Sequence, residues 1–334
     1  MKKKIQRYVQ GTFNTFGCNL NCSYCYLKMK RIYNIGQSFP YGIEYTAKAM
    51  SADRWGICYI SLTGDGETLL SEEAVDLAYY LLKEGHYLNI INNGTQTHSL
   101  EYMCKLLDEE SVSRLMLTFS FHYLELKRKN LLDRFFSNIR MMRNKGFTVY
   151  IHMVLCDEYF PDCEQIKKRC IEEVGILPQL GMIRNESDKD DERRLTSYTE
   201  EEYYKMADSF HSPYFEMQKS LYKENCSKEY CYAGRLGVLL NFTTGIMRQC
   251  VANDRPVQVF EDIEKEIAFE EVGLHCNSPW CYCSTFQIFG MIAGKDYPTY
   301  CMIFENGTNQ YISQNMKYAL DVKLADEYIR TKGR

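Results

Sequence analysis

The chain has 334 residues, a formal net charge of −4, and 45% hydrophobic against 25% charged residues. This ordinary globular composition excludes a disordered, collagen-like or coiled-coil protein, and the length suggests about two domains. The slight acidity gives no electrostatic reason to expect a nucleic-acid partner. No apolar run approaches the ~18 residues that span a bilayer, and the basic start lacks the apolar segment of a signal peptide. We therefore expect a cytoplasmic protein that binds neither nucleic acid nor membrane.

The first two thirds of the sequence alternate between short apolar runs, which predict strands, and longer amphipathic stretches, which predict helices. This alternation indicates βαβ units and a parallel sheet, either open and doubly wound or a partial (β/α) barrel. Both architectures place function at the carboxyl ends of the strands. In chain order we expect strands at 9–15, 57–62, 88–91, 115–121, 147–155 and 180–183, and helices at 44–54, 72–84, 100–108, 131–145 and 163–173, the last one capped by Asp162.

The sequence changes character after this alternating part. Residues 185–199 are polar and highly charged, which predicts a solvated linker, and helices are expected at 200–210 and 313–330. Between them, residues 226–301 contain seven cysteines and few periodic segments. We divide the chain into an α/β domain (1–195), a linker or helical bridge (196–225), a smaller Cys-rich α+β domain (226–312) and a C-terminal helix (313–334).

Fifteen cysteines are many for a chain without an export signal. In a reducing compartment, closely spaced cysteines are more often metal ligands or catalytic groups than disulfides. Cys18, Cys22 and Cys25 follow the first strand at the spacing C-x3-C-x2-C. Soft thiolates select zinc or an iron–sulfur cluster, and this loop offers no fourth ligand for zinc. The spacing therefore favours a cluster with one iron left open for a substrate or second cofactor.

This loop resembles the signature of the radical S-adenosylmethionine (radical SAM) enzymes, C-x3-C-x-aromatic-C after the first strand of a partial (β/α)6 barrel. Tyr24 fills the aromatic position. The resemblance implies a [4Fe–4S] cluster on Cys18, Cys22 and Cys25, whose open iron chelates SAM. It also implies reductive cleavage of SAM to a 5′-deoxyadenosyl radical that takes hydrogen from the substrate. An electron donor such as flavodoxin or ferredoxin is the implied partner, and the enzyme would be sensitive to oxygen.

The resemblance continues at the ends of the second, third and fourth strands. The family has a Gly-Gly-Glu motif beside the SAM amino group, and here Asp65 interrupts the glycine pair. The departure is mild, because backbone carbonyls and Glu67 can still accept hydrogen bonds from an ammonium group. His122 is alternatively a structural histidine, and His152 a polar group of the barrel interior. The SAM contacts implied are Tyr24, Gly64, Asp65, Gly66, Glu67, Asn92, Asn93, Ser120 and His122.

A second group of thiols includes Cys231 and Cys250 at the spacing C-x13-G-x4-C, with a predicted hairpin of strands at 236–242 and 246–250 between them. This half resembles the SPASM or shorter twitch auxiliary-cluster domain of radical SAM enzymes. The following C-x4-C-x-C departs from the full motif and favours one auxiliary [4Fe–4S] cluster over two, with a four-cysteine zinc site as the alternative. The expected ligands are Cys231, Cys250, Cys276 and Cys281, with Cys283 as the main substitute and Cys226 and Cys301 as outsiders.

The five remaining cysteines lie in helical or strand patterns and are expected to be small buried hydrophobic residues: Cys58, Cys104, Cys156, Cys163 and Cys170.

The resemblance to radical SAM enzymes implies an enzyme that acts on a peptide or on a small molecule, a class that includes carbohydrate-related compounds. The short distance from the first residue to the cysteine loop leaves no room for a leader-peptide module, which weakens the peptide reading without excluding it. The alternative is a non-catalytic iron–sulfur or zinc sensor or scaffold, which would have no use for SAM contacts.

Overall fold

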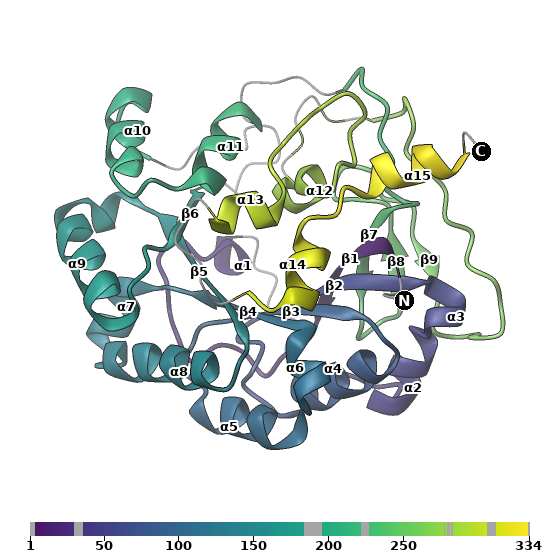
Figure 1. The fold of residues 1–334 in the computed structure, drawn as a ribbon, viewed down its shortest axis with the longest axis horizontal. Helices are drawn as coiled ribbons and strands as arrows, with labels where there is room; N and C mark the ends of the chain where they lie inside the picture. The colour runs from purple at the N-terminus through teal and green to yellow at the C-terminus, as the bar shows by residue number, and fades with distance from the viewer. Residues whose placement is uncertain are drawn as a thin grey trace.

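The computed structural model describes residues 4–29, 36–183, 196–221, 227–276, 278, 281, 283–305 and 312–332. Most of the predicted linker at 185–199 and Cys226 lie outside these residues. The centre of the fold is a nine-stranded sheet in the order β6-β5-β4-β3-β2-β1-β7-β8-β9 (Figure 1). Within the described residues, no helix is both long and apolar enough to cross a membrane.

Six parallel strands, each next to its neighbour in sequence, form the first part of the sheet. This arrangement confirms the predicted partial (β/α)6 barrel and decides against the doubly wound order, which would reverse direction at its middle. All six strands lie close to their predicted positions: β1 (Ile5–Phe13), β2 (Ile57–Gly64), β3 (Tyr87–Asn92), β4 (Leu115–Ser120), β5 (Thr148–Leu155) and β6 (Gln179–Met182).

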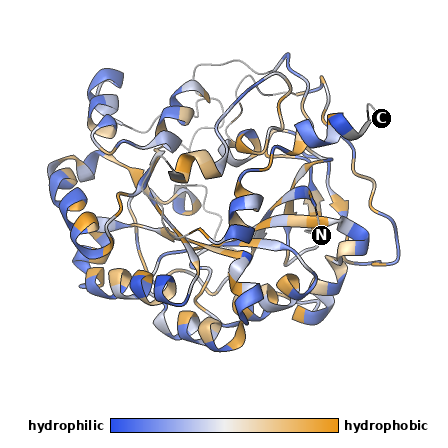
Figure 2. Ribbon diagram, in the orientation of Figure 1, coloured by the Kyte–Doolittle hydropathy of each residue, from blue (hydrophilic) through white to orange (hydrophobic). Residues whose placement is uncertain are grey.

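Helices cover the outer face of these strands, and their apolar sides point toward the sheet (Figure 2). Cys58, Cys156, Cys163 and Cys170 are buried there as predicted, whereas Cys104 is half-buried with its thiol 3.5 Å from the Met142 sulfur. The helices are α1 (Tyr26–Met29), α2 (Ile43–Ala49), α3 (Ala52–Trp55), α4 (Glu73–Lys83), α5 (Thr97–Leu106), α6 (Glu109–Ser113), α7 (Tyr123–Arg128), α8 (Leu132–Asn144), the 3-10 helix η1 (Asp157–Asp162), and α9 (Cys163–Val174).

Three helix predictions were wrong in detail. The helix predicted at 44–54 is broken between α2 and α3, because Ser51 adopts an extended conformation with ψ 146°. The helix predicted at 313–330 is likewise two helices, α14 (Gln314–Leu320) and α15 (Leu324–Lys332). Asp162 does not cap α9, because its carboxylate accepts from the Lys127 ammonium at 3.3 Å instead.

The predicted hairpin of the Cys-rich region extends the same sheet. β7 (Gly237–Asn241) pairs in parallel with β1, and β8 (Ile246–Arg248) returns antiparallel to it, followed by β9 (Val257–Gln258). The turn needs Gly245, whose φ is 69° and whose missing Cβ would stand 2.4 Å from the Gln258 side-chain oxygen. One continuous sheet therefore carries both groups of cysteines.

The concave face of the sheet is filled by the C-terminal part of the chain, which forms a second hydrophobic core with Tyr8, Tyr59 and Tyr150. The helices on this side of the molecule are α10 (Glu200–Asp208), α11 (Pro213–Leu221), α12 (Ser284–Ile288) and α13 (Tyr300–Glu305), together with α14 and α15 (Figure 1).

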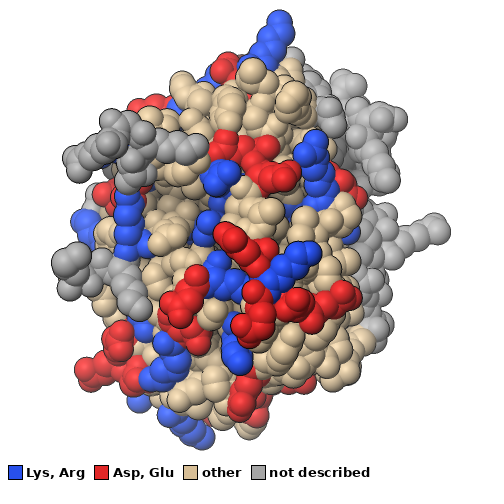
Figure 3. Space-filling view, turned by 90° about the vertical axis from the view of Figure 1, so that its right-hand side faces the viewer, with Lys and Arg blue, Asp and Glu red and all other residues tan. Residues whose placement is uncertain are grey.

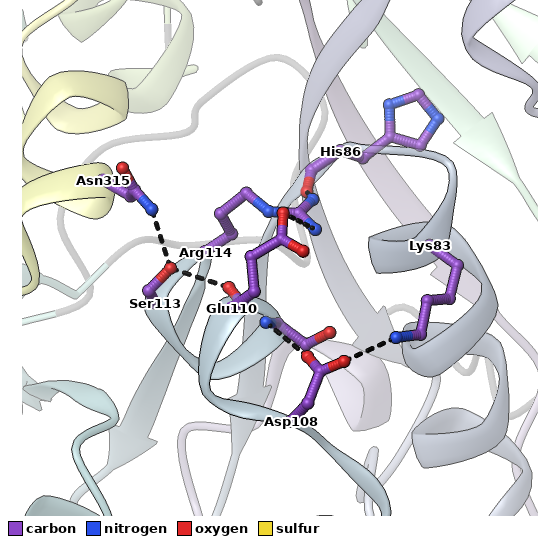
Figure 4. Close-up of polar contacts among 8 residues, drawn as sticks. Lys83, His86, Asp108, Glu110, Ser113, Arg114 and Asn315 are labelled. Carbon is purple, nitrogen blue, oxygen red and sulfur yellow. Dashed lines mark hydrogen bonds and ion pairs between the residues drawn. The ribbon is translucent and has the colours of Figure 1, made fainter. Parts of the chain in front are cut away.

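Polar contacts fix α14 at the amino end of β4 (Figure 4). The Asn315 amide donates to the Ser113 hydroxyl at 2.8 Å, and Ser313 donates to the carbonyl of the same serine. Next to them, Arg114 donates to the His86 carbonyl at 2.8 Å. The C-terminal segment is thereby attached to the amino end of the strand, opposite the edge where barrel sites lie.

The charged surface is mixed. On the face shown in Figure 3, Lys and Arg alternate with Asp and Glu, and no single-sign field covers it. This mixture of signs accords with the small net charge of −4.

Candidate functional site

A cavity of 480 Å³ lies at the carboxyl ends of the barrel strands. Side chains from every strand end between β1 and β6 face it, together with the cysteine loop and the start of α12. Of the SAM contacts that the sequence implied, all except Asp65 line this cavity: Tyr24, Gly64, Gly66, Glu67, Asn92, Asn93, Ser120 and His122.

The three thiols of the loop, Cys18, Cys22 and Cys25, all line the same cavity. Burial, together with the neighbouring charges of Cys18 and Cys25, raises the pKa of Cys22 to about 12. Burial also raises the pKa of Cys18, with a contribution from Glu67. Three thiolates this close to one another need a cationic partner, because each disfavours the ionisation of the others.

The loop is held first against the end of β2. The Glu67 amide donates to the Gly17 carbonyl at 2.9 Å, and the Thr15 hydroxyl donates to the Asp65 carbonyl at 3.1 Å. A Cβ on Gly66 would stand 2.1 Å from the Gly17 oxygen, so only glycine allows this approach. Asp65 therefore takes part through its backbone, which explains why its place in the glycine motif is tolerated.

A set of amides joins the loop to the end of β3. The Asn93 side chain donates to the Asn19 oxygen at 2.7 Å, and Asn19 donates to the Thr95 hydroxyl at 2.8 Å. Asn92 turns away to the backbone, accepting from the Gly94 amide at 2.9 Å. Sequence reasoning missed Asn19 and Thr95, although an asparagine inside a tight cysteine loop was a usable signal.

The loops after β4 and β5 complete the support. The Tyr24 hydroxyl lies 2.8 Å from His122 Nδ1 and 2.9 Å from the Tyr159 hydroxyl. Two carboxylates contact the loop as well, Glu125 at the Asn21 amide (3.0 Å) and Glu158 at the Ser23 hydroxyl (2.6 Å). Tyr159, Glu125 and Glu158 had no motif that could have pointed to them. The ends of β2, β3, β4 and β5 thus all contribute fixed contacts to the cysteine loop.

Glu67 is the buried carboxylate of the cavity, only 2% exposed. It accepts from the backbone amides of Leu69 (3.1 Å) and Asn93 (2.8 Å), yet burial raises its pKa to about 7. A cation placed beside it would restore its negative charge. The geometry therefore gives Glu67 the properties of an acceptor for an ammonium group.

The wall opposite the cysteine loop is uncharged. It includes His152 on β5, Tyr214 and Gln218 on α11, and Thr285 on α12. Burial lowers the pKa of both His122 and His152 to about 4, and for His152 a charge on His122 lowers it further. Both imidazoles are therefore neutral at ordinary pH and can donate or accept hydrogen bonds.

The second group of thiols surrounds a smaller cavity of 40 Å³ behind this wall. Cys231, Cys250, Cys276 and Cys281 all line it, and burial, together with the charges of the other three thiols, raises the pKa of Cys231 to about 12. Cys283 lines both cavities. Cys301 is buried in α13 and does not line either one.

Among the described residues, no three His, Cys, Asp or Glu side chains form a group that could hold a single metal ion.

Comparison with known proteins agrees with this geometry. Residues 14–170 match the radical SAM superfamily. No curated protein matches the chain in sequence.

Solved structures give a likeness in fold. Streptococcus suis SuiB bound to S-adenosylmethionine aligns with a TM-score of 0.54 and 13% identity over 77% of this chain, and SuiB bound to its precursor peptide SuiA with 0.52 and 14% over 78%. The chain spans 64% of SuiB. The anSMEcpe structure with bound AdoMet aligns with a TM-score of 0.57 and 14% identity over 97% of this chain and 98% of that one.

Proposed function

Residues 14–170 form a radical SAM domain, and from this premise we propose that the protein reductively cleaves SAM and uses the resulting radical to take a hydrogen atom from a substrate in the 480 Å³ cavity. The observation that carries the proposal is the meeting of three loop thiols and the buried Glu67 in one cavity at the carboxyl ends of the strands. When bound, the cluster and SAM supply the radical chemistry.

The residues around the loop bind and orient these groups. Cys18, Cys22 and Cys25 would hold a [4Fe–4S] cluster, whose cationic irons compensate the three thiolates. Glu67 would accept from the SAM amino group. The contacts from β2 to β5 hold the loop in place before any cofactor binds, so little reorganisation accompanies loading.

We assign the remaining SAM contacts to the polar groups along the cavity. Asn93 and Ser120 are expected to meet the carboxylate and ribose, and His122, held by Tyr24, would donate from its outer nitrogen. Gly64, Gly66 and Asn92 would shape the surface, and Asp65 would act only through its backbone. These assignments are tested by SAM affinity of the corresponding single variants.

An auxiliary [4Fe–4S] cluster is proposed for the second group of thiols, in a SPASM- or twitch-like domain at 226–312. Its ligands would be Cys231, Cys250, Cys276 and Cys281, because the last three surround the first. Cys283 would then be a fifth thiol outside the cluster. The helical segment 196–225 and the C-terminal segment 313–334 would complete the enzyme around the barrel domain at 1–195.

The substrate class that we favour is a peptide. SuiB has been solved with a bound precursor peptide and shares this fold. In the part of the chain that the structure describes, the only charged groups lining the cavity are Glu67 and Lys28, so a neutral amide backbone fits there without leaving a charge unpaired. A small hydroxylated molecule would fit the same wall, and an external one-electron donor such as a flavodoxin or ferredoxin would supply the reducing electron.

The direct experiment is anaerobic reconstitution with iron and sulfide, followed by SAM and a reductant. We expect 5′-deoxyadenosine and methionine, and we expect Cys22→Ala to abolish both while removing one cluster of iron. Cys104→Ser is the matched control, because its thiol faces Met142 on the outer helices. An iron-loaded wild-type protein that forms no 5′-deoxyadenosine would overturn the proposal.

A further inference from the structure

Five tyrosines lie together on the concave side of the sheet, directly behind the cavity. Tyr8, Tyr59 and Tyr150 come from β1, β2 and β5, and Tyr300 comes from α13. These four are at most 7% exposed. The fifth, Tyr214 of α11, lines the cavity itself. A buried cluster of phenols thus reaches the place where substrate would bind.

Their rings form a connected path. Tyr214 meets His152 edge-on at 5.7 Å between ring centroids, and His152 stacks on Tyr150 at 6.2 Å. From Tyr150 the contacts continue through Phe304 (4.7 Å) to Tyr300 (5.8 Å). Tyr214 is therefore the cavity end of an aromatic chain that runs into the core.

The hydroxyl groups of the four buried tyrosines stay protonated. Burial raises the pKa of Tyr8, Tyr150 and Tyr300, and a charge on the nearby Tyr214 raises each of them further. The Tyr300 hydroxyl lies 2.9 Å from the Thr285 hydroxyl, which lines the cavity. In the described part of the chain, the buried hydroxyls of Tyr59 and Tyr150 have no hydrogen-bond partner. The cluster is accordingly a set of neutral O–H groups in a water-poor space.

Tyr214 itself is firmly placed. It is the second residue of α11, and its backbone amide donates to the Gln179 side-chain oxygen at 3.3 Å. The adjoining Ser212 hydroxyl donates to the same oxygen at 2.9 Å and accepts from the Leu180 amide at 2.9 Å. Both contacts tie the start of the helix to β6, so the phenol is part of a rigid wall and not of a loop.

The charged groups of the cavity lie at the cysteine loop. Among the described lining residues other than the cysteines, only Glu67 and Lys28 carry charge. Glu67 is held by two backbone amides beside the loop, and Lys28 donates to the Cys22 carbonyl at 3.2 Å. The base that this wall offers is the neutral His152 imidazole, and burial makes it a weak one by lowering its pKa to about 4. A reaction that ends by losing a proton, such as formation of a double bond, is therefore poorly served here, whereas a hydrogen-atom donor is in place.

We propose that Tyr214 returns a hydrogen atom to the carbon radical formed in the cavity, so that the reaction replaces a hydrogen on the substrate carbon. This inference rests on the proposed function. In the step, the Tyr214 O–H bond breaks homolytically, a C–H bond forms on the substrate, and a neutral tyrosyl radical remains. One electron from a low-potential iron–sulfur donor and one proton from solvent restore the phenol. The transfer is favourable because a phenol O–H bond is weaker than an ordinary alkyl C–H bond.

The position of the cluster suits this restoration. Tyr8 contacts Phe286 edge-on at 5.5 Å, and Phe286 lines the small cavity of the auxiliary thiols. Tyr8 also joins Tyr300 through Phe289, with centroids 4.9 Å and 6.0 Å apart. The aromatic chain that begins at Tyr214 therefore ends beside the place proposed for an electron-carrying cluster.

The test uses the reconstituted, full-length protein equilibrated in D₂O, with SAM and a reductant but no added substrate. Without substrate, the adenosyl radical reacts with side chains of the cavity wall. Hydrogens bound to carbon do not exchange with D₂O, so deuterium in the product must come from an exchangeable group such as a hydroxyl or a thiol. We expect monodeuterated 5′-deoxyadenosine from the wild type and its loss in Tyr214→Phe. Tyr102→Phe is the matched control, because its hydroxyl binds Asp76 on the outer helices at 2.7 Å, and it should retain the deuterium.

The outcomes separate the two proposals. If no variant forms 5′-deoxyadenosine, the proposed function fails. If the wild type forms it without deuterium, or if Tyr214→Phe retains the deuterium, the role of Tyr214 is overturned. If Tyr214→Phe retains the deuterium in 5′-deoxyadenosine and Cys283→Ser loses it, the Cys283 thiol is the hydrogen-atom donor instead.

Two further readouts do not rely on the deuterium content of the product. Freeze-quenched wild type should show an organic radical in electron paramagnetic resonance whose hyperfine structure narrows with ring-deuterated tyrosine, and an unchanged spectrum contradicts a tyrosyl radical. The urea midpoint of cluster-free Tyr214→Phe should equal that of the wild type, which shows that the cavity wall remains folded.

Discussion

The two groups of cysteines are built in opposite ways. The first is a local loop of eight residues, supported by contacts from the end of each strand between β2 and β5. The second is assembled from segments as far apart as Cys231 and Cys281, brought together by a hairpin and by antiparallel bridges from Cys231 to Gly273 and Ile292. The ligands of a local motif can be recognised from their spacing in the sequence, whereas the ligands of a dispersed site come together only when the chain folds.

The largest expected effect separates the two groups by function. Cys22→Ala and Cys250→Ala should each lower iron by one cluster, but only the first should abolish 5′-deoxyadenosine, because SAM binds at the loop. Iron content and product are measured on the same anaerobic preparations. Loss of SAM cleavage in Cys250→Ala to the level of Cys22→Ala would remove the distinction between the clusters.

The next effect concerns the support of the loop. Gly66→Ala places a Cβ against the Gly17 carbonyl, so the cysteine loop must shift. A misplacement of about 1 Å can cost roughly 100-fold in rate, and we expect a loss of that order in 5′-deoxyadenosine formation. Gly175→Ala is the matched control, since Gly175 also has a positive φ (72°), so that alanine is strained there too, but nothing lies within 4 Å of its missing Cβ. Equal rates in the two variants would show that the loop is not held by this contact.

A smaller effect is expected from the amide bridge to β3. Asn19→Ala leaves the Asn93 amide without its acceptor, which costs about 1–3 kcal/mol for a buried group, whereas the Thr95 hydroxyl keeps its hydrogen bonds to Asn93 and Gln96. Asn19→Asp can still accept from Asn93 and should recover part of the loss. The urea dependence of unfolding in the cluster-free proteins gives the free energies, and an unchanged value in Asn19→Ala would contradict the bridge.

The smallest effect is a pH dependence of the cavity wall. The folded pKa of His152, about 4, lies below its unfolded value of about 6.5. Above pH 6.5 the imidazole is neutral in both the folded and the unfolded state. As the pH falls toward 4, only the unfolded state binds the proton. The free energy of unfolding therefore decreases by at most about 1.4 kcal/mol per pH unit. His122 acts in the same direction, whereas the raised pKa of Glu67 acts in the opposite one.

His152→Gln should therefore make the pH dependence of the urea midpoint shallower between pH 6.5 and 4. His98→Gln is the matched control, because the His98 side chain is 87% exposed. A slope in His152→Gln equal to that of the wild type would show that the imidazole is not buried in its neutral form.

The sequence by itself determined the chemistry of the local motifs and the order of the barrel. Short apolar runs predicted all six parallel strands, and the C-x3-C-x2-C spacing located Cys18, Cys22 and Cys25, because both signals arise between residues that are neighbours in sequence. The helix breaks at Ser51 and after Leu320 were not predicted, since tertiary packing decides where an amphipathic stretch bends.

Only the tertiary structure decided the relations between distant residues. Glu125, Glu158 and Tyr159 support the cysteine loop across more than 100 positions of sequence, and no spacing rule reports such contacts. The continuation of the barrel sheet into β7 and the meeting of five tyrosines behind the cavity have the same origin. The type of a residue determines which interactions its side chain can make. Which partners it meets depends on long-range packing, which a single sequence does not display.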